Sequence, residues 1–163
     1  MNGDEGLERT AKPSVLDRLI DTEPRESADA PLSREESERR YRNAVLRDVE
    51  WLLNTRRTNV SIPDSLPELQ ASAFAFGLPD LSSLSADDRE TRLALVRQIE
   101  RTVRQFEPRL TDVRVSLAPG DEAERRIHFT IEALLKMEPN PERVVFDTVM
   151  EITNGDFSVS STT

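Results

Sequence analysis

The sequence feature that most constrains the fold is a change in the spacing of apolar residues near residue 107. Before this point, apolar residues recur every three or four positions over about 34–55 and 86–106, which is typical of amphipathic helices. After it, apolar and polar residues alternate in "RLTDVRVSL", "RRIHFTIEALL" and "RVVFDTVMEIT", and Asn154-Gly155 is expected to turn the chain into a last short strand. We therefore predict an α+β fold in two layers, with N-terminal helices packed on a small, mainly antiparallel sheet.

The two predicted helices each carry a recognisable start and a buried stripe. Ser33 with Glu36, and Ser85 with Asp88, have the spacing of N-terminal caps. The first stripe is expected to contain Tyr41, Val45, Val49 and Leu52, widened by Leu46, Trp51 and Leu53, and the second Leu93, Val96, Ile99, Val103 and Phe106. Between the helices, glycine and proline argue against regular structure, and Phe74, Phe76 and Leu78 are expected to lie under a loop.

A short amphipathic segment precedes this domain. Val15, Leu16, Leu19 and Ile20 share one face of a helix predicted at 14–21, and a polar, proline-containing linker follows it. A helix this short is marginal alone, so it either folds back on the core or binds another protein. The predicted organisation is a flexible N-terminal region with a docking helix (1–32), a single domain (33–160) and a tail (161–163).

The composition excludes several classes of function. With 33% charged residues and a net charge of −9, the chain should repel nucleic acid and anionic lipid, so no nucleic-acid partner is expected. It has no cysteine, a single histidine (His128) and no phosphate-binding glycine pattern, so no metal or cofactor is expected. No apolar stretch is long enough to span a bilayer and the N-terminus is not a signal peptide, which predicts a cytoplasmic protein without direct membrane insertion.

A pair of carboxylates is the strongest catalytic candidate. Glu107 with Asp112 or Glu100 would suit a glycosidase, but a chain with 31 acidic residues supplies such pairs by chance. One Trp and one Tyr provide little of the aromatic platform that a sugar site needs. His128 falls on the polar face of a strand and is expected to be a surface residue. We therefore expect no catalytic residues and no enzymatic activity.

The segment "RQFEPRL" predicts a rigid charged corner. Pro108 pushes the preceding residue towards extended geometry, so the helix should end at Phe106 or Glu107. Residues two apart in an extended segment project to the same side, so Glu107 and Arg109 should point the same way. They are expected either to bind a partner or to form an ordinary exposed turn. The same three letters occur in the linker at residues 23–25.

Five segments, taken in order, carry a family resemblance: "SVLDRLID", "LRDVEWLLNTRR", "FAFGLPDLSSLS", "IERTVRQFEPRL" and "EPNPERVVFDTVMEITNGDFSV". Together they resemble the TssE-type baseplate subunit of bacterial type VI secretion systems. That family is similar to the wedge protein of contractile phage-tail baseplates, which was once labelled lysozyme-like.

The resemblance implies a structural role in a cytoplasmic baseplate docked at the inner membrane. The implied partners are other baseplate wedge subunits and contractile sheath subunits, with a sheet edge on which the first sheath ring is built. The family's Glu-Pro-Arg motif maps onto Glu107, Pro108 and Arg109 and implies wedge and sheath contacts there. The alternatives are a cell-wall lytic glycosidase and a soluble anti-adaptor-type regulatory protein on the same fold.

Overall fold

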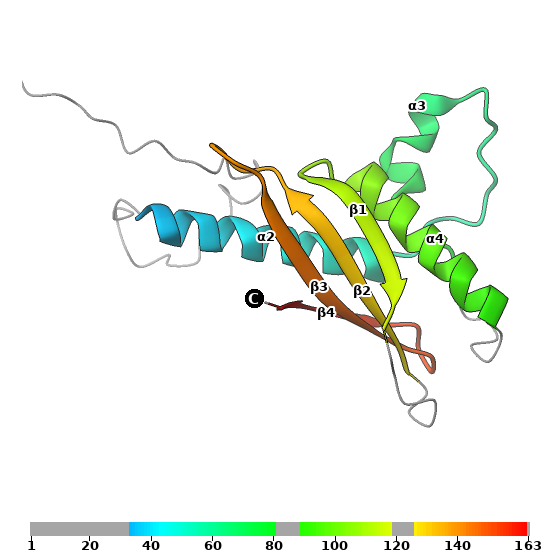
Figure 1. The fold of residues 1–163 in the computed structure, drawn as a ribbon. Helices are drawn as coiled ribbons and strands as arrows, with labels where there is room; N and C mark the ends of the chain where they lie inside the picture. The colour runs from blue at the N-terminus through cyan, green and yellow to red at the C-terminus, as the bar shows by residue number, and fades with distance from the viewer. Residues whose placement is uncertain (1–32, 81–88, 119–125, 163) are drawn as a thin grey trace, which may run out of the picture.

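The computed structural model describes residues 33–80, 89–118 and 126–162 (Figure 1). Within these ranges, four antiparallel strands form a sheet in the order β1-β2-β3-β4. The strands are β1 (Leu110–Leu117), β2 (Arg126–Leu135), β3 (Glu142–Glu151) and β4 (Phe157–Thr162). The helix predicted at 14–21 and the second predicted cap, Ser85 with Asp88, lie outside the described residues.

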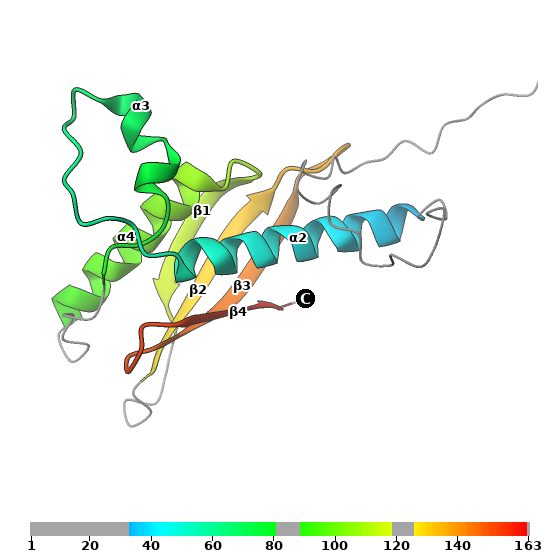
Figure 2. The same cartoon turned by 180° about the vertical axis from the view of Figure 1, so that it is seen from behind.

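Two long helices form the second layer of the domain. Helix α2 (Arg34–Asn54) crosses one face of the sheet, and α4 (Arg89–Phe106) runs beside β1 (Figure 2). The Ser33 hydroxyl oxygen accepts a 3.2 Å hydrogen bond from the Glu36 amide, which confirms the predicted start of α2. Helix α4 ends at Phe106, before Pro108, as predicted. The two-layer α+β prediction is confirmed.

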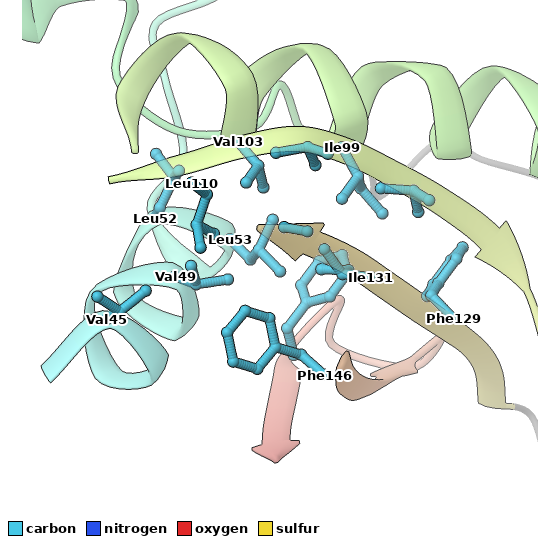
Figure 3. Close-up of a cluster of buried hydrophobic side chains, with 14 of the residues drawn as sticks. Val45, Val49, Leu52, Leu53, Ile99, Val103, Leu110, Phe129, Ile131 and Phe146 are labelled. Carbon is cyan, nitrogen blue, oxygen red and sulfur yellow. The ribbon is translucent and has the colours of Figure 1, made fainter. Parts of the chain in front are cut away.

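The core lies between α2, α4 and one face of the sheet. Figure 3 shows side chains from both helices and from the strands pointing into a common apolar interior. The alternating apolar side chains predicted for the strands form the side of the core that the sheet contributes. The fully buried members include Val45, Val49, Leu53, Ile99, Val103, Val113, Ile131 and Leu135. Trp51 does not join them: its side chain is 50% exposed, because it lies on the side of α2 that faces away from the sheet.

The connection between α2 and α4 carries the short helices α3 (Pro67–Gln70) and η1 (Ala73–Ala75). Leu78 is fully buried and Phe76 packs edge-on against Phe106, with the ring centroids 5.3 Å apart, as predicted. Phe74 is 42% exposed, so its predicted burial is wrong. The next apolar residues, Ala75, Phe76 and Leu78, are the ones that are buried or pack against the core.

A close backbone contact joins this connection to the end of α2. The Leu78 amide donates to the Thr55 carbonyl at 2.9 Å, and the Arg57 amide donates to the Leu78 carbonyl at 2.8 Å. Gly77 has φ +100°, and a Cβ at this position would lie 2.3 Å from the Thr55 carbonyl oxygen. Glycine is therefore required there, both for the left-handed backbone and for the close approach.

Two local features shape the ends of the sheet. Asp112 has φ +51° at a register shift between Thr111 and Arg114, so β1 contains a bulge. The predicted turn before β4 is confirmed, with Gly155 at φ +74°. Strand β4 extends to Thr162, two residues past the predicted end of the domain at residue 160.

Candidate functional site

The corner between α4 and β1 is a tight, hydrogen-bonded turn. The Glu107 amide donates to the Val103 carbonyl at 2.9 Å, and the Leu110 amide donates to the Glu107 carbonyl at 3.1 Å. Pro108 is exposed at its tip. The corner is also tied to the end of β2, because Lys136 donates from its amide to the Arg109 carbonyl (2.8 Å) and from Nζ to the Pro108 carbonyl (2.7 Å).

Glu107 and Arg109 project to the same side, as predicted, and bind each other. Arg109 Nε donates to Glu107 Oε1 at 2.7 Å, and Arg109 Nη2 donates to Glu107 Oε2. The Arg109 amide donates to the same carboxylate at 3.1 Å. Glu107 is only 4% exposed and the Arg109 side chain 19%, so the expectation of an exposed charged turn is wrong. The pair turns inward because α2 supplies a further acid beneath it.

That acid is Asp48 on α2. Arg109 Nη2 donates to Asp48 Oδ2 at 2.6 Å, while Asp48 Oδ1 accepts from Arg47 Nη2 at 2.7 Å. The Arg109 guanidinium carbon lies 6.0 Å from the centre of the Tyr41 ring. We call Arg47, Asp48, Glu107 and Arg109 the corner network. Its two acids balance its two arginines, and it joins the α4–β1 corner to α2.

The corner network favours the charged form of Arg109. Burial lowers the pKa of Arg109, but its hydrogen bonds and charge interactions with Glu107 and Asp48 outweigh this, so its pKa is raised overall. Because the guanidinium already titrates far above neutrality, it stays a cation over the working pH range. A buried ion pair of this kind is costly to break, since removing one partner leaves the other charge desolvated.

The two other acids considered for catalysis, Glu100 and Asp112, have different surroundings. Glu100 accepts from the Val115 amide at 3.1 Å and pairs with Arg104 at 2.9 Å. Asp112 is exposed at the β1 bulge. Glu100 and Glu107 are therefore held in separate ion pairs. His128 lies on the outer face of β2 and is half-buried.

Sequence reasoning missed Asp48 and Arg47. Asp48 lies 61 residues from Arg109, and no local spacing connects them. One signal was present: Asp48 directly precedes Val49 and follows Val45 by three positions, so it borders the buried stripe of α2. An acid at such a position usually needs a partner. The four apolar residues of the predicted N-terminal helix, Val15, Leu16, Leu19 and Ile20, lie outside the described residues.

Residues 33–80, 89–118 and 126–162 contain no group of three or more His, Asp or Glu placed to hold a metal ion. In the same ranges, no helix combines the length and the apolar character needed to cross a membrane.

The fold and the corner network define a small two-layer α+β domain in which buried ion pairs join a helix–strand corner to a neighbouring helix. The family model described as baseplate wedge protein gp25 matches residues 39–140, which cover most of α2 and all of α4, β1, β2 and the corner. The chain belongs to this family, whose type VI homologues are the TssE-type subunits that its sequence resembles. No curated protein and no solved structure matches the chain at a significant level.

Membership places the chain among the structural proteins of phage-tail-like baseplates, which assemble with other baseplate proteins. The family is a structural one. The resemblance found in the five sequence segments is thereby confirmed at the level of the family.

Proposed function

We propose that this protein is a structural subunit of a type VI secretion baseplate, which connects the wedge to the first ring of contractile sheath and helps to nucleate sheath assembly. The observation that carries the proposal is the family match over residues 39–140, combined with sequence segments outside that range that resemble the TssE-type subunit. In this role the protein works in the cytoplasm, in a baseplate docked at the inner membrane, and catalyses no reaction.

We propose the corner as one partner-binding site of this subunit. Pro108 is exposed, and Arg109 keeps part of its side chain accessible while Glu107 and Asp48 fix its direction. Glu107 therefore contributes by orienting Arg109 rather than by meeting the partner alone. A guanidinium held in place loses little entropy when it binds a carboxylate or carbonyl of a wedge or sheath subunit.

We also propose that the segment 14–21 binds another wedge subunit. Its four aliphatic residues, Val15, Leu16, Leu19 and Ile20, would form an apolar contact worth on the order of several kcal/mol before ordering costs. The edge of β4 is proposed as the site where a sheath subunit adds a strand, because edge strands present backbone groups that an extended segment can pair with.

The test is sheath assembly in cells of the source bacterium that carry a fluorescent sheath subunit. Deleting the gene should abolish sheaths, and the wild-type chain should restore them. The purified protein should also retain baseplate and sheath subunits in a pull-down. Normal sheaths in the deleted strain would refute the proposal. Cleavage of peptidoglycan by the pure protein would support the glycosidase, and capture of a protease adaptor would support the regulatory alternative.

A further inference from the structure

Side chains of α2 bind the outward backbone groups of the edge strand β4. Asn54 Nδ2 donates to the Phe157 carbonyl at 2.8 Å, and Asn54 Oδ1 accepts from the Phe157 amide at 2.8 Å. One turn earlier on the helix, Glu50 Oε1 accepts from the Val159 amide at 3.3 Å. We call Glu50 and Asn54 the β4 clip. It satisfies backbone groups that an edge strand otherwise presents to solvent.

The opposite edge strand, β1, is bound by α4 in the same way. Arg104 donates to the Val113 carbonyl from Nε at 3.1 Å and from Nη2 at 2.6 Å. Glu100 Oε2 accepts from the Val115 amide at 3.1 Å. We call Glu100 and Arg104 the β1 clip. Each clip consists of two helical residues four positions apart that contact two strand residues two positions apart.

The two spacings match for a geometric reason. Four residues of α-helix rise about 6 Å, and two residues of an extended strand rise about 6.7 Å. Alternate residues of an antiparallel edge strand direct both their N–H and their C=O away from the sheet. A helix lying along the edge can therefore reach successive outward groups with successive turns. The clip atoms occupy the positions that the backbone of an added strand would take.

The two edges differ in how easily an added strand could replace the clip. On β1, Glu100 and Arg104 are themselves ion-paired at 2.9 Å, and the bulge at Asp112 interrupts the regular ladder. Bulges in edge strands hinder pairing with another chain. Strand β4 keeps an uninterrupted register with β3 from Phe157 to Thr162. In the β4 clip, the neutral amide of Asn54 makes two hydrogen bonds, and the Glu50 carboxylate accepts one long bond at 3.3 Å.

The β4 clip also covers only part of its strand. Its bonds reach Phe157 and Val159, in the first half of β4, and Ser161 lies beyond them. An incoming extended segment could pair first at Ser161 and then replace Glu50 and Asn54 in turn. Each bond that the clip loses would be replaced by a backbone bond from the new strand, so the exchange is nearly balanced.

We propose that the β4 clip is a displaceable guard: it prevents β4 from pairing with other strand edges, including a second copy of this chain, until an extended segment of the correct partner replaces it. This inference rests on the proposed function, in which the sheath subunit supplies that segment. It assigns strand addition to β4 and not to β1. It also assigns to Glu50 and Asn54 a role in selecting the partner.

Amide hydrogen exchange on the full chain alone tests whether the clip protects the edge. Asn54→Ala should speed exchange at Phe157, and Glu50→Ala should speed it at Val159, each about two- to tenfold, as expected for one lost hydrogen bond. Glu50→Gln keeps an acceptor oxygen and should resemble the wild type. Asn43→Ala, at an exposed position of the same helix, is the matched control for Asn54. Unchanged exchange in both alanine variants would overturn the inference.

Self-association and sheath binding test whether the clip is a guard. By sedimentation, Glu50→Ala/Asn54→Ala should associate at concentrations several-fold lower than the wild type or Asn43→Ala. The same double variant should bind purified sheath subunit several-fold more tightly. Faster exchange without greater self-association would overturn the guard. If the sheath subunit binds neither protein, the proposed function fails, while exchange and self-association still decide the role of the clip.

Discussion

The burial of Glu107 makes its charge matter for the stability of the fold. An exposed ion pair typically contributes about 0–1 kcal/mol to stability, because water screens it. Glu107 is 4% exposed and binds Arg109 through both carboxylate oxygens, so its removal would leave a desolvated cation with Asp48 as its remaining acidic partner in the corner network. The corner therefore contributes to folding as well as to any contact with a partner.

We expect Arg109→Ala to destabilise the folded protein by about 3–5 kcal/mol, because it leaves the buried Glu107 carboxylate without its cation. The measurement is urea denaturation of the full chain, read as the shift in midpoint at constant slope. A charged pair in an exposed turn would instead give a change close to zero.

The linker copy of the motif supplies the control. Arg25→Ala removes the same residue type from the same three-letter context, and we expect its midpoint to equal the wild-type value. If Arg109→Ala also leaves the midpoint unchanged, the corner network does not stabilise the fold.

The same network should show coupling between distant positions. Asp48→Asn and Arg109→Lys each remove part of one interaction, so the double variant should lose less stability than the sum of the singles, with a coupling of about 0.5–3 kcal/mol. Lys cannot reproduce the forked donor geometry of Arg109, so the conservative change is informative. Additive losses would mean that Asp48 and Arg109 act independently.

At the scale of helices and strands, the sequence predicted the features that depend on neighbouring residues, such as helix ends and the buried faces of strands. The end of α4 at Phe106 follows from the steric effect of Pro108 on its neighbour. The inward faces of β1 to β3 follow from alternation. Trp51, Phe74 and Leu93 are the exceptions: Leu93 is 39% exposed, so its predicted place in the buried stripe of α4 is also wrong. Their exposure depends on where α2, η1 and α4 lie in the fold, and apolar character alone does not specify that.

The site was less predictable than the fold, because its contacts join segments far apart in the chain. The common direction of Glu107 and Arg109 followed from a local rule, but Asp48, which turns the pair inward, lies on another helix. The same holds for Asn54 and Phe157, which are 103 positions apart. Such pairs form only once the helices have packed on the sheet.

We expect Gly77→Ala to be the most damaging small substitution in the α2–α4 connection. The new Cβ would lie 2.3 Å from the Thr55 carbonyl oxygen, on a backbone with φ +100°. The left-handed backbone alone costs about 1–2 kcal/mol, and the backbone clash adds to this. The fall in melting temperature on thermal unfolding measures this loss. Gly155→Ala should cost less, since its Cβ meets the movable end of Arg56 at 3.0 Å; equal losses would contradict this account.

At the scale of the whole molecule, we expect the N-terminal region to be needed for wedge assembly and not for the stability of the domain. Deleting residues 1–30 should leave the melting temperature nearly unchanged, because α2 begins with its own cap at Ser33. The same deletion should weaken wedge assembly, measured by co-purification with the other wedge subunits. A large fall in melting temperature would instead show that the segment 14–21 packs on the core.

The bond from Lys136 to the Pro108 carbonyl places a lysine amine at the corner, where a chemical cross-linker can react with it. The chain has only two lysines, Lys12 and Lys136, and Lys136 is exposed at the corner. An amine-reactive cross-linker applied to an assembled baseplate can therefore report the neighbours of two separate regions with little ambiguity. Under the proposed function, peptides joined to Lys136 should come from the subunit proposed to bind the corner, and peptides joined to Lys12 from the subunit proposed to bind the N-terminal segment.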